Sequence, residues 1–444
     1  MLTQNKDGSI GPGLATSFGY VGTGNTTFQL TLRDDAKFSD GSPVTADAVK
    51  TWMEYAKTAP GNAAVSYLPL ASVDASGNSV TLHLSAPDPI VPQVLASFSS
   101  VWGTVTSPAA LSNPKGLESA TAGAGPYMLS GPDTVAGDHY TMVPNPYYYD
   151  KTAINFNKVT IKVITSPSTM LQALQAGQLD VAESLSGTTA QAATSAGIDV
   201  ESSPVFNVLV TLLDKTGALA PPMGDVRVRQ ALNYAVDRAA ISKAVAGTFG
   251  TPTAVFATTD GMTSDDQNAY GYDPTKAKSL LSDAGYANGF TMKALCSNQV
   301  ALVCQAVAGE LQAVGIQLDM TQPATTAETA QQLNSATFPV YISQNSVPTT
   351  WQASSALFLK GARLNQQGWN DPTIQDLYNK GSVAPVDSGA QYWQQLMHET
   401  VTQAAEVPLF IAPLFYFVSD SIGGVSVGQS TDWYRPVVLD WYRK

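Results

Sequence analysis

The chain has 444 residues, and its 35 Asp and Glu outnumber its 23 Lys and Arg, which gives a formal net charge of −12. Charged residues make up 13% of the chain, about half of the usual share of roughly 25%. This sparse, acidic balance argues against a nucleic-acid-binding protein, which needs clustered cations, and against docking on an anionic membrane through a polybasic patch. With 44% apolar residues the chain can build large cores, and its length predicts two or three domains.

The first half of the chain alternates strand-like and helix-like segments. Residues 28–33 alternate apolar and polar side chains, which predicts a half-buried strand. A tight turn at Asp40-Gly41 and an N-cap at Thr45 then lead into a predicted helix over 46–57. Further predicted elements are strands over 80–85, 159–164 and 179–181, and a helix over 170–176 that Ser168 caps and Gly177 ends.

The second half of the chain continues this interleaving. Asp225 begins a helix that we expect to run to Arg238. Residues 339–372 are rich in Gln, Asn, Ser and Pro, and we expect loops there. The remaining predicted elements are helices over 276–283, 300–314 and 392–404, and strands over 290–295, 316–320 and 407–418. Strands and helices mix without strict repetition, which is typical of the α/β or α+β class.

We find no residue pattern typical of an enzyme active site. His83, His139 and His398 have no partner at the spacing of a metal site or a catalytic triad. The segment 424–428 fits G-x-S-x-G, but the residues after it do not predict the helix that a nucleophile elbow requires. We therefore predict that the protein is not an enzyme and has no catalytic residue, metal site or cofactor.

Several other local features have no decisive interpretation. Cys296 and Cys304 leave two alternatives open, a local disulfide or two buried thiols. Asn25-Thr26-Thr27 fits the glycosylation sequon, a match that is common by chance. The most apolar stretch, 407–418, is too short to span a bilayer and contains two prolines. The first residues do not read as a signal peptide, so we expect either a cytosolic protein or the mature or truncated form of an exported one.

Six segments, in order along nearly the whole chain, resemble the family 5 extracellular solute-binding proteins. These are the peptide-, nickel- and oligosaccharide-binding subunits of ABC importers. The resemblance is specific because the segments agree in order and in spacing. They are 30–49 around FSDGSPVT, GPYML at 125–129, NPYYY at 145–149, AGQLDV at 176–181, 225–241 around DVRVRQALNYAVDR, and 277–285 followed by 315–316.

The resemblance implies an α/β fold with two lobes, the type II or Venus-flytrap arrangement of periplasmic binding proteins, with an extra subdomain in the first lobe. We expect the first lobe over 1–205 with the inserted subdomain at about 16–150, the second lobe over 206–415, and a C-terminal return to the first lobe over 416–444. The crossings would lie near 203–210 and 413–420. Judged by length alone, we expect that about 40 residues of the family pattern, including a first-lobe strand, are missing or truncated before Leu2.

The resemblance also implies a function. We expect a monomeric extracellular or periplasmic receptor that captures a small peptide, an oligosaccharide or another neutral solute between its lobes by hinge closure. Its partner would be the membrane permease of an ABC importer, and an N-terminal lipid would anchor the full-length protein. Two alternatives remain: a transport-inactive scaffold of the same fold that binds a protein partner, and a hydrolase.

The ligand-binding residues are expected on both lobes. In peptide-binding relatives, an aspartate of a second-lobe loop pairs with the ligand's α-amino group. The matching region here, 338–351, contains no Asp, and the next Asp along the chain is Asp371. This favours a neutral solute held by aromatic faces and amides, and the scarcity of histidine makes a metal ligand the weakest interpretation. The candidate residues are Trp102, Glu183 (a first-lobe carboxylate), Ser184, Phe206, Asn207, Tyr341, Gln344, Asn345 and Trp351.

Overall fold

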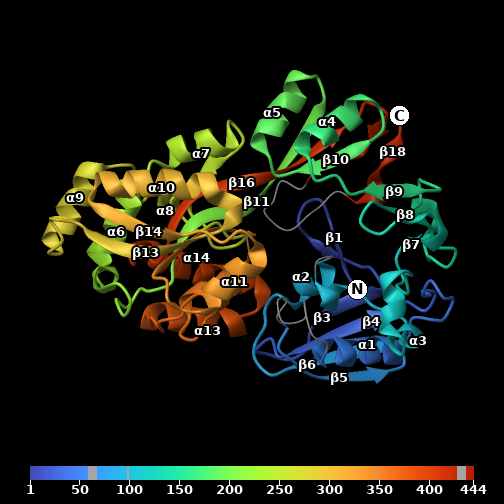
Figure 1. The fold of residues 1–444 in the computed structure, drawn as a ribbon. Helices are drawn as coiled ribbons and strands as arrows, with labels where there is room; N and C mark the ends of the chain where they lie inside the picture. Colours follow the sequence, from blue (N-terminus) through green and yellow to red (C-terminus); the bar gives the residue numbers. More distant parts are fainter. Residues whose placement is uncertain (59–67, 98–99, 347, 428–436) are drawn as a thin grey trace.

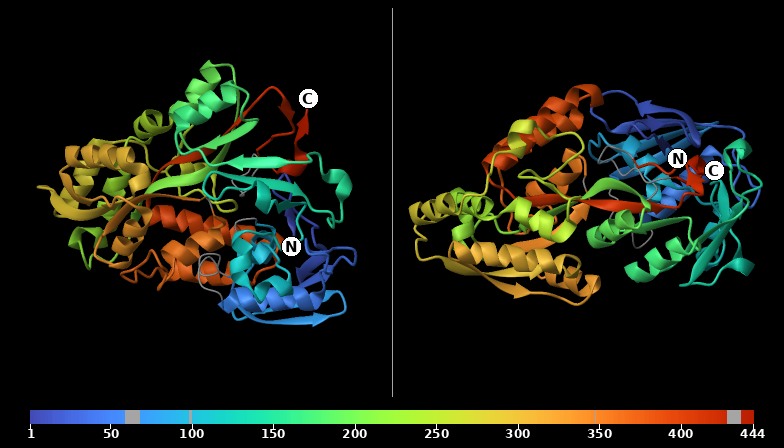
Figure 2. Two further views of the ribbon diagram at one scale, coloured as in Figure 1. Left: turned by 45° about the vertical axis from the view of Figure 1, so that its right-hand side comes forward. Right: turned by 90° about the horizontal axis from the view of Figure 1, so that it is seen from above.

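The computed structural model describes residues 1–58, 68–97, 100–346, 348–427 and 437–444. Figure 1 shows three bodies: an N-terminal body in blue, a middle body in green with the red C-terminal end, and a large body in yellow and orange. The views of Figure 2 show one green and one red strand running from the large body into the middle body. The architecture is therefore divided, and two strands connect its parts.

A seven-stranded sheet forms the centre of the large body and extends into the middle body. The strand order is β10-β16-β11-β15-β13-β14, and β12 pairs with β16. The strand β13 pairs in parallel with β14 and β15, and the other pairs are antiparallel. The bounds are β10 Val181–Ser184, β11 Asp199–Leu212, β12 Thr251–Pro252, β13 Phe290–Cys296, β14 Ile316–Thr321, β15 Val340–Ser346 and β16 Val407–Val418.

Helices cover both faces of this sheet. One apolar core packs side chains of α6 and α10 on the sheet, and a second includes side chains of α12 to α14 on the opposite face. Because both faces are covered, β16 and the last residues of β11 are nearly continuous apolar runs. The helices are α6 Val226–Ala235, α7 Arg238–Ala246, α8 Ser264–Gln267, α9 Pro274–Asp283, α10 Ala301–Ala313, α11 Thr326–Asn334, α12 Thr350–Ala353, α13 Pro372–Val383 and α14 Val386–Thr402.

The N-terminal body is built on a four-stranded antiparallel sheet in the order β3-β4-β6-β5. Phe28, Leu30 and Leu82 are buried on the face of the sheet that α1 covers. This matches the alternation predicted from the sequence. Thr45 caps α1, since its hydroxyl accepts the N–H of Ala48. The bounds are β1 Thr3–Gln4, β2 Ile10–Gly11, β3 Ala15–Tyr20, β4 Thr27–Leu32, α1 Ala46–Thr58, β5 Leu70–Ser76, β6 Ser79–Leu84, α2 Val91–Ala96 and α3 Pro108–Leu111.

The middle body combines a three-stranded sheet, two helices and the C-terminal segment. The helices pack on the β10 end of the large sheet through a small core that includes Leu174, Ala190 and Phe417. The chain end is held there because Arg443 forms an ion pair with Asp180. The bounds are β7 Tyr127–Leu129, β8 His139–Pro144, β9 Val159–Lys162, α4 Pro167–Gln175, α5 Gly187–Ser195, β17 Ile422–Gly423 and β18 Tyr442–Arg443.

Short helical turns connect these elements. They are the 3-10 turns η2 Val101–Gly103, η3 Pro114–Glu118, η4 Gly131–Asp133, η5 Lys151–Ala153, η6 Pro221–Gly224, η7 Asn298–Val300 and η9 Val438–Asp440, and the π-helix η8 Ser354–Phe358.

The strands β11 and β16 pair along almost their whole length and cross from one body to the other. Their register shifts twice, between Pro204 and Phe206 and between Val208 and Leu209. At one end β16 pairs with β10, and at the other end β11 pairs with β15. The segments near 203–210 and 413–420, where we expect the crossings, lie largely on these two paired strands.

Most predicted elements are confirmed, but the helix predicted over 225–238 is wrong. Asp225 does cap α6, but the helix ends at Ala235. Asp237 then begins α7 as a second cap, with its carboxylate 2.9 Å from the N–H of Ala240. Arg238 is buried and donates to the carbonyl of Pro408 at 2.8 Å. Two competing caps and an inward-facing arginine outweigh the continuous helical pattern.

Two smaller predictions also need correction. The region 339–372, expected as loops, contains β15, α12 and η8. The polar residues of β15 suggested a loop, but the strand lies between β11 and β13, which satisfy its backbone. The cap of α4 is Ser166, which accepts the N–H of Thr169, rather than Ser168.

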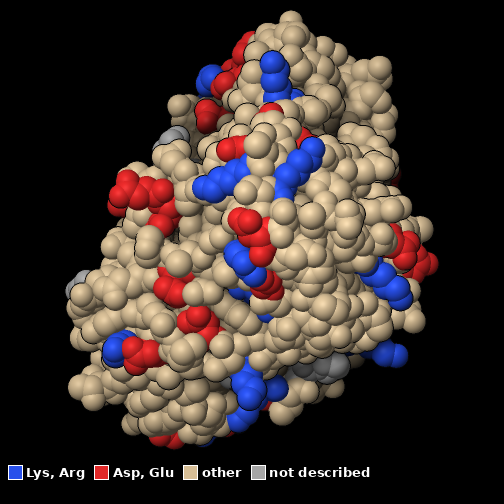
Figure 3. All heavy atoms as spheres, turned by 90° about the vertical axis from the view of Figure 1, so that its left-hand side faces the viewer, with Lys and Arg blue, Asp and Glu red and all other residues tan. Residues whose placement is uncertain are grey.

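Charged side chains are scattered over the face that lies at the left of Figure 1. Figure 3 shows acidic and basic groups mixed there, with wide uncharged areas between them. This agrees with the low overall content of charged residues and shows no basic stripe on that face.

Candidate functional site

The pleat of two central strands divides the predicted ligand residues between opposite faces. In the register of β11 and β15, Asn207 faces Asn345 and Thr211 faces Tyr341, so Asn207, Asn345 and Tyr341 share one face. Phe206 and Gln344 are offset by one residue and lie on the other face. The structure thus brings three of these five residues together and separates Phe206 and Gln344 from them.

Asn207 holds a neighbouring loop in place. Its side-chain amide donates to the carbonyl of Ala257 and accepts the N–H of the same residue, both at 2.8 Å. The side chain is only 2% exposed. The sequence predicts Asn207 as a ligand-binding residue, and in the structure its amide has a backbone partner.

The loop that Asn207 holds carries Asp260 to the start of α12. The Asp260 carboxylate accepts the N–H of Thr350 at 2.7 Å, and the hydroxyls of Thr258 and Thr350 lie 2.9 Å apart. Burial raises the pKa of Asp260, and the hydrogen bond to Thr350 opposes this shift. A carboxylate therefore lies beside the region 338–351 although the sequence there contains none.

Trp351 follows Thr350 on α12 and is 4% exposed. Its ring stacks with that of Tyr378, with centroids 6.2 Å apart and planes at 21°. Its indole Nε1 is buried and has no hydrogen-bond partner among the residues that the structure describes. An unpaired buried donor destabilises the protein. A ligand atom that accepts a hydrogen bond from this N–H would therefore remove that cost and stabilise the complex.

Tyr341 connects the site to the end of β13. Burial raises the pKa of its hydroxyl, and hydrogen bonds with Ser297 and Ser343 oppose this effect. A disulfide joins Cys296 to Cys304, which is the first of the two alternatives left open by the sequence. The bond links the end of β13 to α10 directly beside Ser297.

The remaining candidates lie elsewhere. Glu183 and Ser184 are on β10 in the middle body, facing Tyr416 and Phe415 of β16. Glu183 is exposed, and the hydroxyl of Ser184 accepts the N–H of Ser186 at 3.1 Å. Trp102 is 3% exposed and belongs to the core of the N-terminal body. The structure does not offer Trp102 as a ligand wall, because packing already covers its ring.

Sequence reasoning missed Asp260, and only a weak local signal pointed to it. The dipeptide Asp260-Gly261 is a common turn pattern. Position 261 has no room for a side chain, because a Cβ there would lie 2.2 Å from Oγ1 of Thr350 and 2.7 Å from Cγ of Met397. The close approach of the two segments is a tertiary effect between residues that are 90 positions apart.

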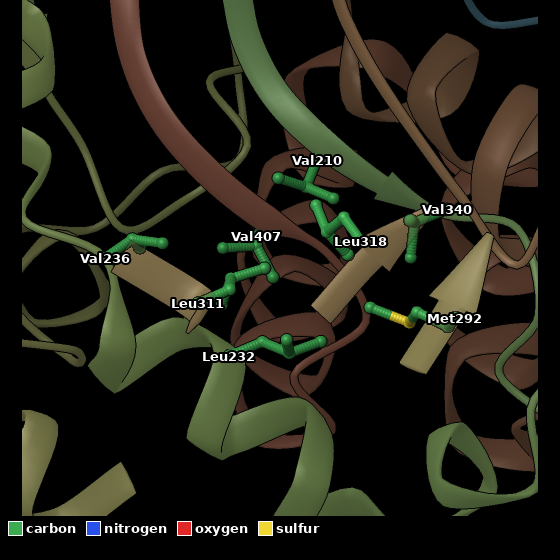
Figure 4. Close-up of a pocket in the computed structure, with 8 residues that line it drawn as sticks. All are labelled: Val210, Leu232, Val236, Met292, Leu311, Leu318, Val340 and Val407. Atoms are coloured by element: carbon green, nitrogen blue, oxygen red, sulfur yellow. The ribbon is translucent and has the colours of Figure 1, made fainter. Parts of the chain in front are cut away.

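An enclosed apolar void in the large body is a feature of core packing. Figure 4 shows its lining side chains turned toward one another from β11, α6, β13, α10 and neighbouring strands. The lining consists of Val210, Leu232, Val236, Met292, Leu311, Leu318, Val340 and Val407. It contains no polar side chain that could orient a polar solute.

Neither a metal-binding cluster nor a membrane-spanning helix is found in the described parts of the chain. No group of three or more His, Cys, Asp or Glu side chains there is arranged to hold a metal ion. None of the described helices is long and apolar enough to cross a membrane. Gly428, the last residue of the G-x-S-x-G match, lies outside the described residues.

Comparisons with known proteins match most of the chain. The model of the bacterial extracellular solute-binding proteins, family 5 middle region, matches residues 9–366. The periplasmic murein peptide-binding protein of Escherichia coli is 29% identical over 319 residues, which cover 64% of this chain and 57% of that protein. The nickel-binding periplasmic protein of E. coli is 29% identical over 311 residues, 64% of this chain and 55% of that protein. The matches thus span little more than half the length of these relatives.

Solved structures share the fold over nearly all of the chain. NikA from Brucella suis, in complex with Fe(III)-EDTA, aligns with a TM-score of 0.82 at 20% identity and covers 100% of this chain and 93% of its own. The murein tripeptide-binding protein MppA, in an unliganded open form, aligns with a TM-score of 0.78 at 21% identity and covers 100% and 90%. At these identities the likeness establishes the two-lobed α/β fold.

Proposed function

The chain belongs to the bacterial extracellular solute-binding proteins of family 5, and from this premise we propose that it is the solute-binding receptor of an ABC importer. It captures a small organic solute between two lobes and delivers it to the importer's membrane permease. Its place is outside the cytoplasmic membrane, in the periplasm or at the cell surface, held by an N-terminal lipid in the full-length protein, and it acts as a monomer. The relatives described above are binding proteins, which favours this role over a hydrolase or a protein-binding scaffold.

The lobe boundaries in this proposal are those that we expect from the sequence. The first comprises 1–205 with the inserted subdomain at about 16–150 and the return over 416–444, and the second comprises 206–415. The observation that carries the proposal is the pair of crossing strands. Pro204 and Pro413 are direct partners in β11 and β16, and neither residue can donate a backbone hydrogen bond. The pairing is thus weakened where the chain crosses, which suits a hinge.

The ligand is a small organic solute with amino or hydroxyl donors, such as a short peptide or an oligosaccharide. Asp260 supplies a buried hydrogen-bond acceptor, and burial disfavours its negative charge. A donor or a cation on the ligand would stabilise that charge. Trp351 supplies an unpaired indole donor, and Tyr341 and Asn345 supply a hydroxyl and an amide on the same sheet face. From the first lobe, the proposal keeps Glu183 and Ser184 of β10 as the expected ligand contacts.

A panel of short peptides and oligosaccharides tests this proposal through thermal unfolding. A ligand at about 100 times its Kd stabilises the folded protein by about 2.7 kcal/mol. We expect one class to raise Tm in the wild type and the rise to shrink in Asp260→Asn and Trp351→Phe. Asp260→Asn preserves the shape of the side chain and keeps an acceptor for Thr350, whereas Trp351→Phe keeps an aromatic ring but removes the indole N–H and one ring. Tyr272→Phe, at an exposed aromatic, is the control and should respond as the wild type does. A panel without any shift in the wild type would contradict the proposal.

A further inference from the structure

One side chain of the N-terminal body is hydrogen-bonded to the second lobe. Asn25 lies in the turn between β3 and β4, and its amide Nδ2 donates to the carbonyls of Ser382 and Ala384, each at 2.8 Å. These carbonyls belong to the corner where α13 ends and α14 follows. The views of Figure 2 show the blue N-terminal segment beside the orange and red helices. The contact therefore bridges the inserted subdomain and the second lobe.

The turn is shaped to present this amide. Gly22, Gly24 and Asn25 all have positive φ, of 79°, 83° and 52°, a conformation that Gly and Asn adopt most easily. The carbonyl of Asn25 accepts the N–H of Asp88 at 3.0 Å, which ties the turn to its own subdomain. Asn25 is 7% exposed, so water competes little for its two hydrogen bonds. Its Nδ2 is engaged, which also argues against its use as a glycosylation acceptor in this conformation.

Two unpaired polar atoms lie next to the contact. Oδ2 of Asp88 and Oγ of Ser382 are buried without a hydrogen-bond partner among the described residues. Each residue is joined to Asn25 by one of the bonds given above. Buried unpaired groups weaken the state that buries them, whereas the two Asn25 bonds strengthen it. A contact with such opposing contributions is suited to form and break reversibly.

We propose that the β3–β4 turn is a latch in which Asn25 holds the inserted subdomain on the second lobe and sets the population of the closed receptor. This proposal rests on the proposed function, because it assumes lobes that open and close. Asn25 contacts backbone carbonyls of the opposite lobe. It would therefore change the ligand affinity through the equilibrium between the open and the closed receptor. The apparent Kd changes with the fraction of molecules in the binding-competent state.

Three variants separate the amide from the backbone of the turn. Asn25→Gly removes both hydrogen bonds and tolerates a positive φ. Asn25→Asp preserves the shape but directs a carboxylate at two carbonyl oxygens. Asn78→Gly is the matched control, because Asn78 is an exposed turn residue of the same subdomain, between β5 and β6. Spin labels at the exposed positions Ser76 and Ser282 report the distance between the two lobes in the ligand-free protein.

In the wild type we expect a distance distribution dominated by the closed form. Asn25→Gly should shift the open-to-closed ratio by roughly 5- to 100-fold, as expected for two lost hydrogen bonds. Asn25→Asp should open the protein further, and Asn78→Gly should match the wild type. Identical distributions in the wild type and Asn25→Gly, with unchanged circular dichroism, would overturn the latch. The readout needs no ligand, so the latch can fail while solute binding in the thermal panel still succeeds, and the reverse also holds.

Discussion

The side-chain amide of Asn207 forms two hydrogen bonds with the backbone of Ala257, one as donor and one as acceptor. This pair fixes the loop that ends at Asp260 against the central strand β11. The geometry of the second-lobe wall thus depends on a residue that is itself hidden from solvent.

Replacing Asn207 should loosen this wall. Asn207→Ala leaves the N–H and the carbonyl of Ala257 without their partner, and we expect the free energy of unfolding to fall by about 2–4 kcal/mol. The affinity for the ligand should fall as well, because Asp260 loses its support. Urea denaturation measures the first effect and calorimetry the second. Asn345→Ala is the control for stability. Among the described residues the Asn345 amide bonds only the hydroxyl of Ser343, so this change should cost less than about 1 kcal/mol. Equal losses in both variants would contradict this account of Asn207.

The stability of the protein should depend on the ionisation of Asp88. Burial raises the pKa of Asp88 to about 7, and the hydrogen bond from the N–H of Ile90 opposes the shift. Between about pH 4 and pH 7 the folded protein holds a proton at Asp88 that the unfolded chain has lost. The free energy of unfolding therefore falls as the pH rises across this window, and the contribution of Asp88 is complete below it and lost above it.

Asp88→Asn should remove that part of the slope, because an amide does not titrate in this range. Chemical denaturation at several values between pH 4 and pH 8 measures the difference between the variant and the wild type. Burial also raises the pKa of Glu406 to about 7, but this contribution is present in both proteins and cancels in the difference. A constant difference at all pH values would show that Asp88 is ionised in the folded protein throughout.

A buried ion pair in the second lobe gives a second stability test. Nζ of Lys215 lies 3.4 Å from Oε1 of Glu406 and 2.6 Å from the carbonyl of Leu212, and both side chains are fully buried. Burial lowers the pKa of Lys215, whereas Glu406 opposes this shift. Lys215→Met leaves Glu406 alone in the core and should lower the free energy of unfolding by about 3–5 kcal/mol.

The double variant Lys215→Met/Glu406→Gln should recover most of that loss. Glutamine keeps an acceptor for the N–H of Leu212, which Glu406 accepts at 2.9 Å, and it carries no charge. Guanidinium denaturation of the two single variants and the double variant forms a complete cycle. Losses that simply add would mean that the two side chains do not interact.

The disulfide between Cys296 and Cys304 should stabilise the edge of the site. It closes a loop with a sequence separation of 8, and a loop of this size is worth about 2–3 kcal/mol. Cys296→Ala/Cys304→Ala should lower the free energy of unfolding by that amount and abolish any response to dithiothreitol. If the wild type and the double variant were equally stable without reductant, the two residues would be thiols instead.

The sequence predicts most of the local secondary structure, but it predicts the candidate site only in part. The alternation over 28–33 and the caps Thr45 and Asp225 follow from short-range chemistry, and the structure confirms them. Gln344 and Tyr341 lie on opposite faces of the sheet because side chains alternate along β15. The sequence does not predict this, because its polar composition indicates a loop in this region. Asp260 reaches Thr350 from 90 positions away, and no short-range pattern encodes such a contact.

Native mass spectrometry of the purified protein tests the central claim of reversible solute capture most directly. The protein would be measured as purified and after incubation with the peptide and oligosaccharide panel, under native and then denaturing conditions. We predict a small-molecule adduct that is present in the native spectrum, lost on denaturation, and weakened in Asp260→Asn. A bare chain under every condition would contradict a receptor that holds a solute between its lobes.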